Sequence, residues 1–144
     1  MNQDTRRSLE DLLDREIELA RVLAASLAAE RAALTGNSPQ AVEKLAAEKI
    51  GVLAQIETLE KERQALSAAP MGPGFGALVM ERWRALMELM AGCRSANEVN
   101  GHIIHVRQHQ IRQLIEIVRG GGPSITYDHQ GKTFAKALRA LARA

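Results

Sequence analysis

Two long runs of helical apolar spacing, joined by a short break, constrain the fold of this chain most strongly. Residues 8–34 contain no glycine or proline and show apolar side chains at three- and four-residue spacing, with Ser8 suited to begin a helix. Residues 39–67 repeat the spacing more strictly, at Val42, Leu45, Lys49, Val52, Ile56, Leu59, Arg63 and Leu66. Between the runs, residues 35–39 (Thr-Gly-Asn-Ser-Pro) are of the types that end one helix and begin the next. The sequence therefore predicts a long antiparallel helical hairpin.

Four charged residues indicate how the two helices of this hairpin are aligned. If residues whose numbers sum to 79 lie opposite each other, leucines of the first helix face apolar residues of the second. The same alignment places Glu30 opposite Lys49 and Glu16 opposite Arg63. We expect these pairs to fix the register more than they stabilise the fold, because desolvation cancels much of the Coulomb attraction. The alternative is that all four side chains lie at the exposed edge of the hairpin with their charged ends in water.

Two further helices are expected after a loop rich in proline and glycine. The third, about 76–94, carries an apolar stripe in which Trp83 should seal it onto the hairpin, although its methionines could instead form an adaptable binding surface. The fourth, about 97–119, follows a capping-box pattern at residues 95–98 and ends at a glycine-rich break. The predicted fold class is thus all-α, with two helices packed on the hairpin.

Composition agrees with one helical domain. Alanine (23) and leucine (17) make up 40 of the 144 residues, and only four are Phe, Trp or Tyr, which favours helices over strands. The chain has a single cysteine, no apolar run near 18 residues and no signal peptide, so we expect a cytoplasmic protein. We expect residues 1–131 to form the domain and residues 132–144 a short amphipathic tail.

The order of several segments along the chain resembles the FlgN family of flagellar export chaperones. These segments are the helical hairpin, the stretch from Trp83 to Cys93, the element Asn97-Glu-Val-Asn100-Gly101, and the turn Ile-Thr-Tyr127-Asp-His-Gln-Gly at residues 125–131. The resemblance covers about residues 8–131. Asn97, Asn100 and Gly101 match the family's Asn-x-x-Asn-Gly element, and we expect them to satisfy backbone groups where helices cross tightly. The chain departs from the family where Asp128, rather than glycine, follows the tyrosine.

The resemblance implies a cytoplasmic chaperone of the type III flagellar export system. Such a protein binds the amphipathic terminal helices of hook-associated proteins, prevents their premature assembly, and delivers them to the export gate and its ATPase-complex components. The region from about Gly101 onward would hold the client, through Ile111, Leu114, Val118, Phe134, Leu138 and Leu141. Tyr127 would dock on the export gate; the alternative is that it packs over the last helix and closes the domain.

Charge is distributed unevenly between the two parts of the chain. Residues 1–101 carry 15 acidic and 12 basic side chains, whereas residues 102–144 carry 2 acidic and 7 basic ones. The tail, 132–144, has four cations and no acid, and it is too short to be a stable helix in water unless its apolar face docks on something. An acidic protein partner, a membrane surface or nucleic acid would fit this charge, although we expect no stable membrane insertion.

Other functions have weaker support in the sequence. A structural module that self-associates through the hairpin remains an alternative, and nucleic-acid binding is less favoured because no helix-turn-helix or zinc-finger spacing is present. No catalytic residues, cofactor or metal site are expected. Cys93 lies on an apolar stripe as a buried small residue would, and His102, His105 and His109 share a helix face without a carboxylate or thiol at matching spacing. The sequence leaves open the identity of the client and the oligomeric state.

Overall fold

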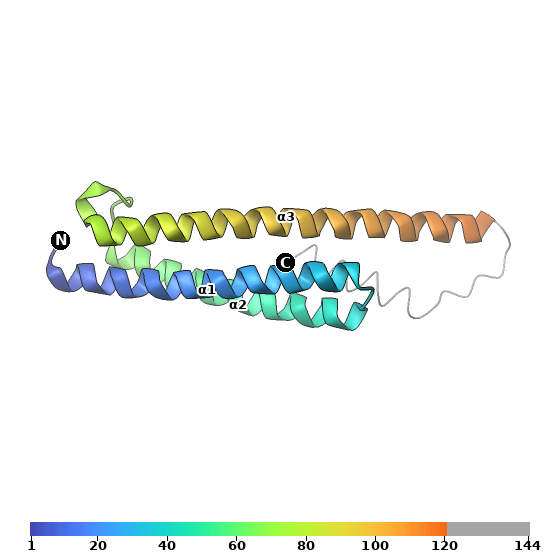
Figure 1. Ribbon diagram of the computed structural model, residues 1–144, viewed down its shortest axis with the longest axis horizontal. Coiled ribbons are helices and arrows are strands. Elements are labelled where there is room, and N and C mark those ends of the chain that lie inside the picture. Colours follow the sequence, from blue (N-terminus) through green and yellow to red (C-terminus); the bar gives the residue numbers. More distant parts are fainter. Residues whose placement is uncertain (121–144) are drawn as a thin grey trace.

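Three long helices make up almost all of the computed structural model, which describes residues 1–120 (Figure 1). Helix α1 spans Gln3–Thr35, α2 spans Pro39–Leu66 and α3 spans Ala77–Gly120, with a short 3-10 helix η1 at Pro73–Phe75 before α3. The predicted all-α helical bundle is confirmed. α3 lies along the α1–α2 hairpin and extends past the turn that joins α1 to α2.

The ends of the hairpin helices follow from side-chain capping. α1 begins before Ser8, because Asn2 caps it: the backbone N–H of Thr5 donates to Asn2 Oδ1 at 2.8 Å. Ser38 caps α2 as expected, and its Oγ accepts from the backbone N–H of Ala41 at 3.4 Å. In the turn, Asn37 takes the left-handed conformation with φ of 64°.

α3 is one continuous helix, so the prediction of separate helices at 76–94 and 97–119 is wrong. The capping-box pattern at residues 95–98 suggested a new helix start, but within and beside it Asn97 and Asn100 bond to the hairpin, Asn97 to Lys49 and Asn100 to Glu30. Because these partners satisfy the side chains, the helix can continue through the capping-box pattern at residues 95–98. Most of the stability of this 44-residue helix therefore comes from its packing against the hairpin, not from the intrinsic helix propensity of its residues.

α1 is the central helix of the bundle. It packs closely along both α2 and α3, whereas the backbones of α2 and α3 lie farther apart and these two helices touch through long side chains. The buried residues of α1 include an alternating three- and four-residue repeat, at Leu9, Leu13, Glu16, Ala20, Leu23, Leu27, Glu30 and Leu34. Trp83 packs beside the cluster of Leu13, Val79 and Leu86, in the sealing position expected from the sequence. None of the described helices is long and apolar enough to cross a membrane.

Candidate functional site

α3 carries one continuous stripe of residues at alternating three- and four-residue steps, which we call the α3 seam. The seam consists of Val79, Trp83, Leu86, Met90, Cys93, Asn97, Asn100, Ile104, Arg107, Ile111, Leu114 and Val118. This spacing is that of a coiled coil, in which such positions face a partner helix. Along most of its length the α3 seam faces the hairpin, and the buried residues of α3 all belong to it.

The hairpin ends before the α3 seam does. Arg107 Nη1 donates to Asn37 Oδ1 at 2.9 Å, which marks the turn between α1 and α2. Ile111 still packs at the edge of the cluster that contains Leu34. Beyond it, Leu114 is 60% exposed and Val118 is 49% exposed. We call Ile111, Leu114 and Val118 the projecting seam; they are the three described residues among those expected to bind a client.

Two layers of polar side chains cross the bundle where the sequence predicted ion pairs. In the first, Arg63 Nε lies 2.9 Å from Glu16 Oε2, and the Arg63 guanidinium lies over the Trp83 ring at 4.8 Å from its centroid. In the second, Lys49 Nζ lies 3.2 Å from Glu30 Oε2. Glu16, Glu30 and Lys49 are buried, so the alternative of an exposed edge is wrong for the hairpin. The predicted register is therefore the observed one.

The second layer reaches all three helices. Lys49 Nζ also donates to Asn97 Oδ1 at 3.2 Å, and Asn100 Nδ2 donates to Glu30 Oε1 and to the backbone oxygen of Leu27, both at 2.9 Å. Asn100 thus satisfies a backbone oxygen of α1, as expected, whereas Asn97 bonds the side chain of Lys49 instead of a backbone group. Two buried oxygens of this layer, Glu30 Oε2 and Asn100 Oδ1, accept no hydrogen bond from residues 1–120, although Glu30 Oε2 is in charge contact with Lys49.

Gly101 does not have the role that the sequence suggested. A Cβ added at this position would meet nothing within 4 Å, so no helix approaches closely there. At the Asn-Gly element the contact with α1 is made by the side chain of Asn100 instead. The glycine itself is exposed on α3.

Burial changes the ionisation of two groups in the bundle. Desolvation raises the pKa of Glu16 above its ordinary value, even though the nearby Arg63 charge and hydrogen bond lower it. Burial also raises the pKa of the Cys93 thiol, whose Sγ lies 3.5 Å from the backbone oxygen of Ala20. Cys93 is therefore the buried small side chain expected from the sequence, and its environment does not activate a thiolate.

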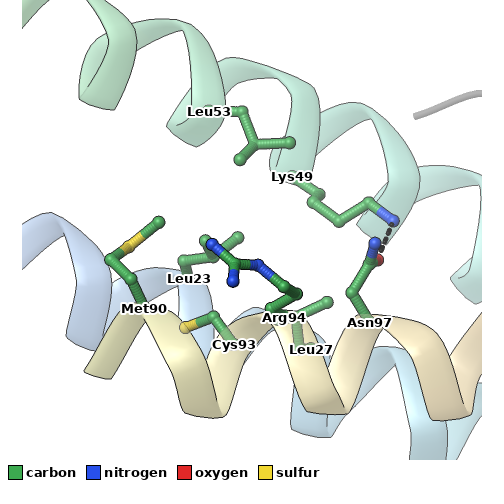
Figure 2. Close-up of a pocket in the computed structure, with 8 residues that line it drawn as sticks. All are labelled: Leu23, Leu27, Lys49, Leu53, Met90, Cys93, Arg94 and Asn97. Carbon is green, nitrogen blue, oxygen red and sulfur yellow. Dashed lines mark hydrogen bonds between the residues drawn. The ribbon is translucent and has the colours of Figure 1, made fainter. Parts of the chain in front are cut away.

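A hollow of about 130 Å³ lies between α2 and α3, over the middle of α1. Figure 2 shows its lining, which consists of Leu23, Leu27, Lys49, Leu53, Met90, Cys93, Arg94 and Asn97. Sequence reasoning did not single out Leu53 or Arg94, because they lie beside the regular helical stripes. No pattern within one helix would have placed these two residues at a common surface.

Four residues proposed from the sequence as binding residues lie outside the described residues: Tyr127, Phe134, Leu138 and Leu141.

The three histidines that share a face of α3, His102, His105 and His109, are exposed. Within residues 1–120 no three His, Cys, Asp or Glu side chains are grouped so that they could hold a metal ion.

A helical bundle whose coiled-coil seam continues beyond its own partner helices is suited to binding helices of another protein. Comparison with known families agrees with this class. The model of the family described as FlgN protein matches residues 1–134, so the chain belongs to the FlgN family. This is a family of flagellar export chaperones. Neither a curated protein nor a solved structure matches the chain.

Proposed function

We propose that this chaperone binds the amphipathic terminal helices of hook-associated proteins, the proteins of the hook–filament junction. The complex forms in the cytoplasm, and the projecting seam is its centre. While bound, the client's apolar helix faces are covered and cannot assemble prematurely. The chaperone then delivers the client to the export gate and its ATPase-complex components.

The exposure of the projecting seam is the observation that carries this proposal. Ile111, Leu114 and Val118 lie at i, i+3 and i+7 of one helix, which is the anchor spacing used when an amphipathic helix docks on a partner. They continue the stripe that the hairpin covers elsewhere, so the same kind of surface that binds α1 and α2 is left for another helix. Burying the exposed parts of Leu114 and Val118 against a client helix would add favourable hydrophobic free energy to the complex.

Self-association through the hairpin, the competing function, has less support. The inward-facing charged pairs of the hairpin are covered by α3, through Trp83 at one layer and Asn97 and Asn100 at the other. A second copy would have to displace α3 to reach that surface. We therefore expect the complex with a client to contain one chaperone molecule.

Light scattering coupled to gel filtration tests the proposal, with each purified hook-associated protein of the source bacterium as client. We expect a 1:1 complex with the unchanged chaperone and about 100-fold weaker binding for Leu114→Glu with Val118→Glu, because two central anchors are lost. Val99→Glu is the matched control, since Val99 is also an exposed apolar residue of α3 but lies off the α3 seam. Equal binding by the double variant and the control would refute the role of the projecting seam.

Residues beyond Gly120 complete the proposal on the strength of the family resemblance alone. Phe134, Leu138 and Leu141 extend the client-binding surface, and Tyr127 docks on the gate. Deleting residues 132–144 should weaken client binding while thermal stability stays nearly unchanged. Tyr127→Ala should leave folding and client binding intact while reducing binding to the cytoplasmic domain of the gate; early unfolding of this variant would instead assign Tyr127 to the fold.

A further inference from the structure

The hollow between α2 and α3 is separate from the projecting seam. Its floor is formed by Leu23 and Leu27 of α1, and Met90, Arg94 and Asn97 of α3 form one wall (Figure 2). From Asn97 to Ile111 is 14 residues, or about 21 Å along the helix. Ile104, between them, is buried in a cluster that closes the surface. A partner that occupies the projecting seam therefore leaves the hollow available to a second segment.

The middle of α2, which lies above this hollow, is only partly buried. Between Lys49 and Leu59 no residue of α2 is buried, although Val52, Leu53 and Ile56 pack partly against α1 and α3. Gly51 lies in the same stretch, and an added Cβ there would meet nothing within 4 Å. Apolar side chains on both walls are therefore only partly covered by the chain itself.

Arg94 is the group at the hollow that suits an acidic partner. Lys49 and Arg94 line the hollow and no carboxylate does, but Lys49 is buried and already paired with Glu30. Arg94 is exposed and makes no ion pair or hydrogen bond with any residue of the described chain. Asn97, one turn away, uses its Oδ1 for Lys49, which leaves its Nδ2 free to donate. The sequence at 132–144 has four cations and no acid, so its charge makes it a poor occupant.

We propose that the hollow is a second part of the client-binding site. It receives one bulky aliphatic side chain from a second helical segment of the same client, and a carboxylate about one turn away on that segment pairs with Arg94. An apolar anchor surrounded by a charged contact at the rim is a common arrangement in protein interfaces. This inference rests on the proposed function, since it needs the client that the projecting seam binds.

Two variants of the chaperone test the inference with the same full-length hook-associated protein. Arg94→Glu reverses the free charge at the rim, and Leu53→Trp fills the hollow. We expect each to weaken client binding about tenfold, mainly through faster dissociation. Arg84→Glu is the control, because Arg84 is another exposed arginine of α3 that does not line the hollow. It should bind within about twofold of the unchanged protein. Circular dichroism checks that each variant keeps its helical fold.

Two further measurements test the inference: an NMR signal from a side chain at the hollow, and a rescue of Arg94→Glu by charge reversal on the client. In chaperone labelled with ¹³C at its methionine methyl groups, client binding should shift the Met90 resonance, since Met90 lines the hollow. Changing single client acids to lysine should restore binding to Arg94→Glu at one position, which identifies the pairing carboxylate.

The two proposals fail in distinguishable ways. If Arg94→Glu and Leu53→Trp bind like the control and Met90 does not respond, while Leu114→Glu with Val118→Glu still loses the client, the hollow is only a packing defect. The proposed function would then stand without it. If the unchanged chaperone forms no complex with a hook-associated protein, both proposals are refuted.

Discussion

Glu30 and Lys49 lie 3.2 Å apart in the centre of the bundle, with only 1% and 3% of their side chains exposed. Each is held by an asparagine of α3, Glu30 by Asn100 and Lys49 by Asn97. Taking two charges out of water costs several kcal/mol each, so the arrangement adds little net stability. It does make any other alignment of the three helices costly, because a shift by one residue would leave a buried charge without its partner.

The first prediction concerns this pair. Glu30→Lys alone should lower the free energy of unfolding by about 3 to 5 kcal/mol, because two buried cations then face each other. Combining it with Lys49→Glu should recover part of the loss, since opposite charges meet again, although Asn97 and Asn100 are placed to bond the original polarity. Urea denaturation followed by circular dichroism gives both values. The exposed pair Glu57 and Lys61, 3.1 Å apart on α2, is the control, and reversing one of its charges should cost less than about 1 kcal/mol.

The two asparagines provide a second prediction with nearly identical substitutions. Asn100→Asp replaces the Nδ2 donor to Glu30 with an oxygen and brings two buried carboxylates together, so it should destabilise the fold by about 3 kcal/mol or more at pH 7. Asn97→Asp keeps the oxygen that accepts from Lys49, on an exposed side chain, and should change stability by less than about 1 kcal/mol. Similar losses for the two variants in urea denaturation would contradict the assigned hydrogen bonds.

The hairpin register could be predicted from the sequence because all the information lies in two helices joined by a short turn. Once the turn fixes an antiparallel pair, leucine spacing and the Glu16 and Glu30 positions select one alignment. The continuity of α3 could not be predicted in the same way. The capping-box pattern at residues 95–98 resembles a helix start, and only the partners of Asn97 and Asn100 on α2 and α1 explain why the helix continues.

The candidate site likewise has features that the sequence of one helix predicts and features that depend on how the helices pack. The spacing of Ile111, Leu114 and Val118 identifies an apolar helix face, but spacing does not say whether that face is covered. Exposure depends on where the hairpin turn falls along α3, a position that the hydrogen bond from Arg107 to Asn37 marks. The hollow was missed because Leu53 and Arg94 come from different helices, and their proximity depends on how α2 and α3 are rotated.

A third prediction follows from the exposed glycine of α3. Gly101→Ala should raise the free energy of unfolding by about 0.5 to 1 kcal/mol, because alanine loses less backbone freedom in a helix and its Cβ meets no atom. Gly51→Ala in α2, which also has open space around its Cα, should give a similar gain. Thermal and urea denaturation measure both. A loss of stability in Gly101→Ala alone would mean that a close helix crossing forms there after all.

The pH dependence of stability gives the last prediction, through Glu16. Burial raises the pKa of this carboxyl in the folded protein, so the folded state holds the proton more tightly than the unfolded chain. The stability that Glu16 contributes is therefore fully present below its ordinary pKa of 4.5 and is lost as pH rises through the raised folded value. Glu16→Gln removes this titration and keeps an oxygen that can accept from Arg63.

We expect the stability of the unchanged protein relative to Glu16→Gln to fall as pH rises above 4.5, and urea denaturation at several pH values measures this slope. Glu18→Gln is the control, because it makes the same substitution at a side chain of α1 that is exposed to water. A slope of opposite sign for Glu16 would mean that the attraction of Arg63 outweighs desolvation. The Glu16–Arg63 layer would then stabilise the bundle as well as align it.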